Sequence, residues 1–198
     1  VVCRRQRQMC IRDRILEAFR SLTKTLDLTN NDFIRTTEPR HLKSVNEVWD
    51  RLIKSGDIYL DKYSGWYSLS DEAYYEADEI EEKNGKKISI SSGSIVEWVE
   101  EESYFFKLSA WQKKLLEHYK KNEDFILPRS RKNEVRSFVE KGLKDLSISR
   151  TSFSWGIPVP ENKKHIIYVW LDALTNYLSA LNFPNTNDNK FKSFWPAD

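Results

Sequence analysis

The chain has 198 residues, a formal net charge of +2, a hydrophobic fraction of 39% and an aromatic fraction of 13%. This composition excludes intrinsic disorder, and the length suits one or two domains with a substantial core. No apolar run approaches the ~20 residues that cross a membrane and no secretory signal is visible, so we expect a soluble protein of the cytoplasm or mitochondrial matrix, without a membrane partner.

Residues 1–14 differ from the rest of the chain. They hold both cysteines, Cys3 and Cys10, together with the only methionine, and five arginines against one acidic residue. A basic arm for nucleic acid is one interpretation. We favour a non-native, artefactual segment, to be left out of fold reasoning. No cysteine follows residue 14, which excludes a disulfide framework and a thiolate metal site in the remainder.

Two helices are predicted next. The apolar residues between Ile15 and Leu26 indicate the end of an amphipathic helix, and a polar break follows it. Thr37 is expected to cap a second helix that has Pro39 in its first turn, and Gly56 is expected to end it. The apolar face of this second helix comprises Leu42, Val45, Val48, Trp49 and Leu52.

From residue 57 the pattern changes to short strands and helices. The runs Ile58–Lys62 and Gly65–Leu69 predict a β-hairpin rich in Tyr and Trp. Residues 71–82 are acidic and are expected to be helical, whereas residues 83–94 predict a loop or hairpin tip. Further strands are predicted at Val96–Val99 and Ser103–Phe106, with helices that begin at Ser109 and Ser130.

The stretch from residue 168 to 177 predicts a strand that passes directly into a helix. Trp170, Ala173, Leu174 and Tyr177 share one helix face, where two large aromatics flank a small residue. Such a face suits a slim apolar ligand beyond the carboxyl end of a strand. A helix face with this residue spacing is more often packed in the protein core than used to bind a ligand.

Three blocks of sequence, taken in order, resemble those of methionyl-tRNA synthetases, which are class I aminoacyl-tRNA synthetases. The first block is Asp32–His41, and the second is Val96–Phe106 with Leu108–Trp111. The third runs from Asp145–Arg150 through Trp155–Pro160 and Tyr168–Ala173 to Phe194–Asp198. The resemblance covers nearly everything from about residue 15 onward.

The resemblance implies an α/β fold: a partial Rossmann-type nucleotide-binding domain that is interrupted by a small α+β connective-peptide insertion. Residues 15–56 would be the end of the first Rossmann half. Residues 57–150 would be the insertion, and residues 151–198 the start of the second half.

The resemblance also implies a methionine–tRNA ligase, with methionine, ATP and tRNA as its partners. Trp170, Ala173, Leu174 and Tyr177 match the family's positions around the methionine side chain, although some members carry proline in place of Leu174. The family's HIGH and KMSKS motifs, which act on ATP with Mg²⁺, are absent here. We therefore expect no catalytic residue in this chain and no activity from it alone.

Many members of the family hold zinc on a cysteine knuckle in the connective peptide. The matching region here, around residues 77–96, contains no cysteine. The histidines His41, His118 and His165 are widely separated and show no metal-ligand spacing, so they are expected to be surface or capping residues. We expect no zinc and no other metal held by this chain.

Two further residues could support the site. Arg150 is either an exposed rim residue or one half of a buried ion pair near the substrate, with its partner beyond residue 198. Asp172 lies in a first helical turn, where a carboxylate favours the helix dipole, so capping is its expected role.

The block at 104–114 interleaves aromatic residues with lysines. It suits the core of a small domain with a solvated lysine face, or stacking on unpaired bases near the tRNA acceptor end. A different class of function also stays open, namely a non-catalytic RNA-binding or assembly module derived from a class I synthetase. HIGH upstream and KMSKS downstream in the intact gene would distinguish the enzyme from the module.

Overall fold

The computed structural model describes residues 4–71, 73–83, 85–152 and 154–196, without the side chains of residues 4–13 and Tyr63. Helix α1 (Arg4–Thr25) confirms the predicted helix up to residue 25, and it extends far into the segment expected to be non-native. Its apolar residues Ile15, Phe19 and Leu22 are exposed. Cys3 lies outside the described residues, as does the side chain of Cys10.

Helix α2 (Pro39–Lys54) starts one residue later than a cap at Thr37 requires, so that prediction is wrong. Glu38 is the N-cap, and its side chain accepts hydrogen bonds from Arg35 N and Arg40 Nε instead of capping the helix. The predicted end is confirmed. Gly56 has a φ of +74°, which favours glycine, and its N–H donates to the Ile53 carbonyl.

The main sheet has four antiparallel strands in the order β2-β1-β5-β6, and its centre is a long two-stranded ladder. Strand β1 (Ile58–Ser68) pairs with β5 (Glu97–Phe106) from Ile58 opposite Phe106 to Tyr67 opposite Glu97. The predicted hairpin within residues 58–69 is therefore wrong, and the two strands predicted at 96–106 are one. Gly65, predicted to begin the second strand of that hairpin, lies inside β1 opposite Val99.

The segment between these strands contains no α-helix in its described part, so the helix expected at residues 71–82 is wrong. It holds β2 (Ala73–Tyr75), a short 3-10 turn and strand β3 (Ile80–Lys83). Strand β3 pairs with β4 (Lys86–Ser89), so a hairpin is present as predicted, but residues 86–89 of the expected loop form a strand. Strands are favoured over a helix here because Tyr residues of β2 pair across to β1, and Ile residues of β3 and β4 pair across their own hairpin.

Two helices follow β5. A 3-10 turn (Leu108–Trp111) precedes α3 (Gln112–Lys121), so Ser109 does not cap α3. Its backbone N–H donates to Asp145 Oδ1 instead. Helix α4 (Arg129–Glu140) confirms the second predicted helix to within one residue.

The last part of the chain returns to the core. Strand β6 (Leu146–Ser147) closes the main sheet, and β7 (Ser149–Arg150) pairs antiparallel with β8 (Ile166–Ile167). The remaining helices are α5 (Val169–Leu174), α6 (Asn176–Ser179) and α7 (Asn189–Phe194). All ladders between the described strands are antiparallel, so the parallel sheet of a Rossmann domain does not occur within them.

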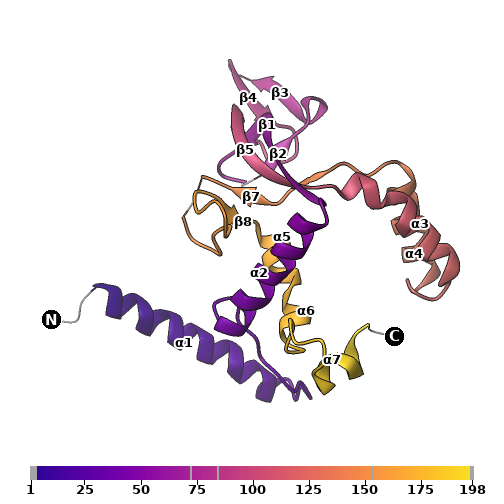
Figure 1. Cartoon of the computed structure of the whole chain (residues 1–198). Helices are drawn as coiled ribbons and strands as arrows, with labels where there is room; N and C mark the ends of the chain where they lie inside the picture. The colour runs from indigo at the N-terminus through magenta and orange to yellow at the C-terminus, as the bar shows by residue number, and fades with distance from the viewer. Residues whose placement is uncertain (1–3, 72, 84, 153, 197–198) are drawn as a thin grey trace.

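The core lies where α2, the start of β1 and the β7–β8 pair meet. Its buried members are Val45, Trp49, Ile58, Ile148, Ile157, Val159 and Ile167. Figure 1 shows the strands of the main sheet at one end, α3 and α4 projecting to one side, and α2 beside α5 and α6. This arrangement brings the helix that begins after β8 against α2.

Candidate functional site

The helix after β8 has the predicted form. Strand β8 leads through Tyr168 into α5, and α6 continues the path after a single residue, Thr175. Trp170, Leu174 and Tyr177 are 57%, 55% and 70% exposed, and Ala173 is half-buried. Within the described chain these four side chains therefore form an exposed apolar face, called here the α5 face, and not a stripe in its buried core.

The opposite side of the same helices is buried and polar. Asp172 is 9% exposed, and its Oδ1 lies 2.6 Å from Nε2 of His41 on α2. His41 is fully buried, and its Nδ1 lies 3.0 Å from Ser179 Oγ. Asp172 lies in the first turn of α5 as predicted, but the expected capping role is wrong, because the N-cap is Tyr168 and the Asp172 side chain is bonded to α2. Asp172 also lines a cavity of about 290 Å³ beside the start of α2.

Arg150 is buried, so the rim interpretation is wrong. Its Nη1 donates to Ser147 Oγ at 2.6 Å and to the Ser149 carbonyl at 2.7 Å. Its guanidinium carbon lies 4.2 Å from the centre of the Tyr168 ring, the residue that precedes α5. Within the described ranges no carboxylate forms an ion pair with Arg150.

Two of the three histidines were wrongly expected at the surface. His41 is fully buried and His165 is 1% exposed, whereas His118 on α3 is exposed as predicted. His165 Nδ1 lies 3.0 Å from Ser149 Oγ, beside the buried β7–β8 pair. A signal for His41 was present in the sequence, since His41, Val45 and Trp49 repeat every four residues along the buried stripe of α2.

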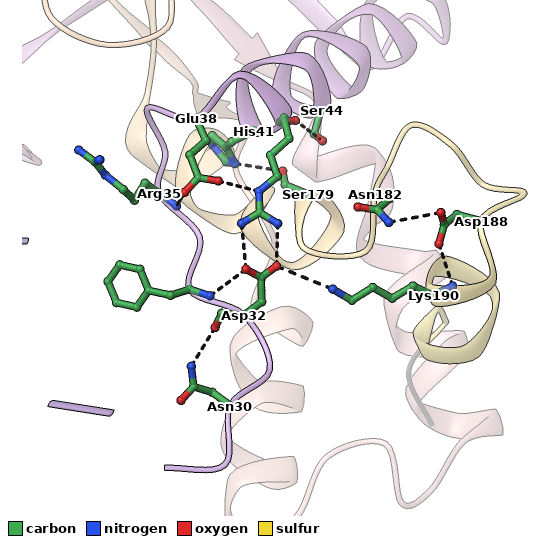
Figure 2. Close-up of polar contacts among 12 residues, drawn as sticks. Asn30, Asp32, Arg35, Glu38, His41, Ser44, Ser179, Asn182, Asp188 and Lys190 are labelled. Carbon is green, nitrogen blue, oxygen red and sulfur yellow. Dashed lines mark hydrogen bonds and ion pairs between the residues drawn. The ribbon is translucent and has the colours of Figure 1, made fainter. Parts of the chain in front are cut away.

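An ionic cluster ties the start of α2 to α7 (Figure 2). Arg40 donates to Asp32 at 2.7 Å and to Glu38 at 2.6 Å, and Lys190 of α7 lies 3.7 Å from Asp32. The hydrogen bonds that Arg40 donates lower the pKa of Asp32, and the acceptance of these bonds by Asp32 raises the pKa of Arg40. The cluster joins the first and last parts of the described chain, next to the His41 network.

The aromatic residues of the 104–114 block make internal contacts. Tyr104 packs edge-on against Trp49 and His165, and Phe106 stacks on Trp111. Lys114 Nζ lies 4.2 Å from the centre of the Trp111 ring. These contacts support a role of the block in the core, and stacking on RNA stays a prediction.

The described residues contain no group of three or more His, Cys, Asp or Glu side chains that could hold a metal ion. None of the helices within them is both long enough and apolar enough to span a bilayer.

Comparison with known proteins gives one consistent result. Residues 6–198 match the family model described as tRNA synthetases class I (M). The methionine–tRNA ligases of Brucella suis and Rickettsia typhi are 53% and 55% identical over 94% of this chain. That of Listeria monocytogenes is 51% identical. A solved Mycobacterium tuberculosis methionyl-tRNA synthetase, bound by methionyl-adenylate, is 49% identical with a TM-score of 0.82 over 92% of this chain.

The chain spans 36% of the length of the Brucella, Rickettsia and Mycobacterium proteins, and 29% of the Listeria protein. The family match begins at residue 6, inside the segment expected to be non-native. The family model matches almost the whole chain, and the relatives that are more than 50% identical belong to the same family. The chain therefore belongs to the methionyl-tRNA synthetases, a family of class I tRNA synthetases.

Proposed function

We propose that the intact protein is a methionine–tRNA ligase that activates methionine with ATP and transfers it to tRNA. The observation that carries this proposal is the open α5 face, in a chain 49% identical to a synthetase solved with methionyl-adenylate. ATP with Mg²⁺ and the tRNA 3′ end would be handled by parts of the protein outside this chain. No zinc is assigned to it.

Within that protein, residues 15–56 and 151–198 would belong to a Rossmann-type nucleotide-binding domain, and residues 57–150 to its connective-peptide insertion. The division is supported by the strands β1, β2, β5 and β6, which all lie within residues 57–150 and form a sheet of their own. The core around α2 also includes Ile58 and Ile148, so the two parts share it at their boundary.

The α5 face would hold the methionine side chain. A thioether is polarizable and gains ~0.3–1.5 kcal/mol from each aromatic contact. Trp170 and Tyr177 lie one above the other along the helices, and Ala173 between them leaves room for a slim chain. The Tyr177 hydroxyl can donate to sulfur, which is a poor acceptor. Leu174 would add apolar contact at the edge of this face.

Arg150 and Asp172 would support the site from behind. Arg150 is buried under Tyr168, where its planar cation fixes the point at which β8 passes into α5. Asp172 is fixed by α2 on the side opposite the α5 face. Neither side chain is proposed to react.

The test is activation kinetics on the intact protein, in which methionine-dependent ATP–pyrophosphate exchange separates the two substrates. Trp170→Ala should raise the KM for methionine by about 30-fold, as expected for a loss of about 2 kcal/mol at a contact that dominates binding. Tyr177→Phe should cost less, about 0.5–1.5 kcal/mol, because it removes one hydroxyl. The KM for ATP should stay unchanged in both variants.

Trp98→Ala is the matched control, because Trp98 is similarly exposed, at 54%, but lies on β5, where it contacts Trp66 of β1. It should leave both KM values unchanged. The isolated chain should catalyse no exchange, since the HIGH and KMSKS motifs are absent from it. If Trp170→Ala raises the KM for ATP but not for methionine, the pocket assignment is wrong. Absence of exchange by the intact protein would favour the non-catalytic module.

A further inference from the structure

The buried network behind the α5 face has a defined arrangement of hydrogen bonds. A carboxylate only accepts, so His41 Nε2 carries the proton that it donates to Asp172 Oδ1 across 2.6 Å. His41 Nδ1 and Ser179 Oγ, 3.0 Å apart, share a second bond. His41 is thereby bonded to α5 at one ring nitrogen and to α6 at the other.

The network connects a fixed platform to the helices that carry the α5 face. Helix α2 is anchored in the core by Val45 and Trp49, which are both fully buried. Helix α5 has only six residues, so it has little stability of its own. Asp172 lies between Trp170 and Ala173 in the sequence but points to the opposite side. Its bond to His41 therefore fixes the rotation of α5 about its own axis.

We propose that His41 is a positioning residue for methionine binding: through Asp172 and Ser179 it holds α5 and α6 in the orientation that presents Trp170 and Tyr177 to the substrate. This inference rests on the proposed function of the α5 face. Without the bond, α5 samples other rotations. The apparent affinity for methionine then falls in proportion to the fraction of molecules with the competent orientation.

Three variants of the intact protein test the geometry. His41→Ala removes both bonds. His41→Gln places an amide nitrogen near the former Nε2, so it can still donate to Asp172. His41→Asn places its amide nitrogen near the former Nδ1, too short to reach Asp172. We expect the KM for methionine to rise at least tenfold in the Ala and Asn variants and less than threefold in the Gln variant.

The matched control is Ser44→Ala. Ser44 is also fully buried on α2, one turn after His41, but it donates to the Phe183 carbonyl rather than to α5 or α6. A residue with a purely structural role lowers the amount of active enzyme, and so kcat, without changing one KM. Ser44→Ala should show that behaviour. The KM for ATP should change less than twofold in every variant.

The outcomes separate the two proposals. If His41→Gln and His41→Asn bind methionine equally poorly, or if both substrates are affected alike, the positioning role is wrong. The Gln and Asn pair decides the question even where His41→Ala does not fold. If Trp170→Ala raises the KM for methionine and no His41 variant does, only the positioning role fails. If none of these variants changes the KM for methionine, the pocket on α5 is itself wrong.

Discussion

At the scale of single residues, Asp71 joins β2 to the loop that follows β4. Its carboxylate accepts hydrogen bonds from Ser92 at 2.6 Å, from Tyr75 of β2 at 2.7 Å and from Ser94 at 2.8 Å. The bond from Ser92, followed by those from Tyr75 and Ser94, lowers the pKa of Asp71 to about 2. The charged carboxylate thus holds the loop after β4 against β2.

We expect the stabilisation from Asp71 to depend on pH in a defined direction. Its pKa in the folded protein lies below the ordinary 3.8, so the contribution is complete above pH 3.8 and is lost as the pH falls toward 2. Asp71→Asn should lower the urea midpoint at pH 7, and the difference from the unmodified protein should shrink below pH 4. Asp78→Asn, at an exposed position, is the control. A difference of equal size at pH 7 and pH 2.5 would contradict this prediction.

Gly156 is the second residue whose identity the structure requires. Its φ is +130°, and an added Cβ would lie 2.5 Å from Cγ2 of Ile166, a buried residue of β8. Gly156→Ala should cost about 2–4 kcal/mol, because backbone strain and overpacking add. Gly93→Ala is the control, since Gly93 also has a positive φ but nothing lies within 4 Å of its added Cβ. Similar urea midpoints for the two variants would show that the contact with Ile166 relaxes freely.

At the scale of elements, helices were predicted better than strands. The 3.6-residue period of α2 and α4 is local, so their ranges could be read to within one or two residues. The β1–β5 ladder joins residues about 40 positions apart, and local pattern carries no information about such partners. The sequence pattern placed Gly65 at the start of a second strand, although it lies inside β1, because glycine interrupts the pattern of a continuous strand.

In the candidate site, too, local features could be predicted from the sequence and long-range contacts could not. The α5 face was predictable because its four residues follow one helical period. The partner of Asp172 was not, because His41 lies 131 residues earlier in the chain. The burial of Arg150 depends likewise on Tyr168, which follows it after an irregular segment. Local sequence therefore predicted the α5 face, but not the network behind it.

At the scale of the whole molecule, residues 57–150 share part of the buried core with the rest of the chain. Ile58 at the start of β1 and Ile148 after β6 belong to the same buried cluster as Trp49 of α2. Farther from this cluster, β1 pairs with β2 as well as with β5, and aromatic residues of β1 and β5 contact each other, such as Trp66 and Trp98. Residues 57–150 thus contact the common core at one end of their sheet and make contacts among themselves at the other.

We expect residues 57–150, expressed alone, to fold as a separable unit. Hydrogen exchange should show protected amides along the β1–β5 ladder, because ten residues of each strand pair there. Protection should be weakest around Ile58 and Phe106, where α2 is missing. Uniformly fast exchange along the ladder would show that the insertion needs the rest of the protein to fold.

The long separation between His41 and Asp172 has a consequence during synthesis on the ribosome. The partners of α2 emerge late, since Asp172 follows His41 by 131 residues and Phe183 follows Ser44 by 139. At a synthesis rate of about 5–20 residues per second, Asp172 is added to the chain roughly 7–26 s after His41. The β1–β5 ladder is complete well before then, so the nascent chain carries a formed sheet while α2 still exposes the side chains that it later buries.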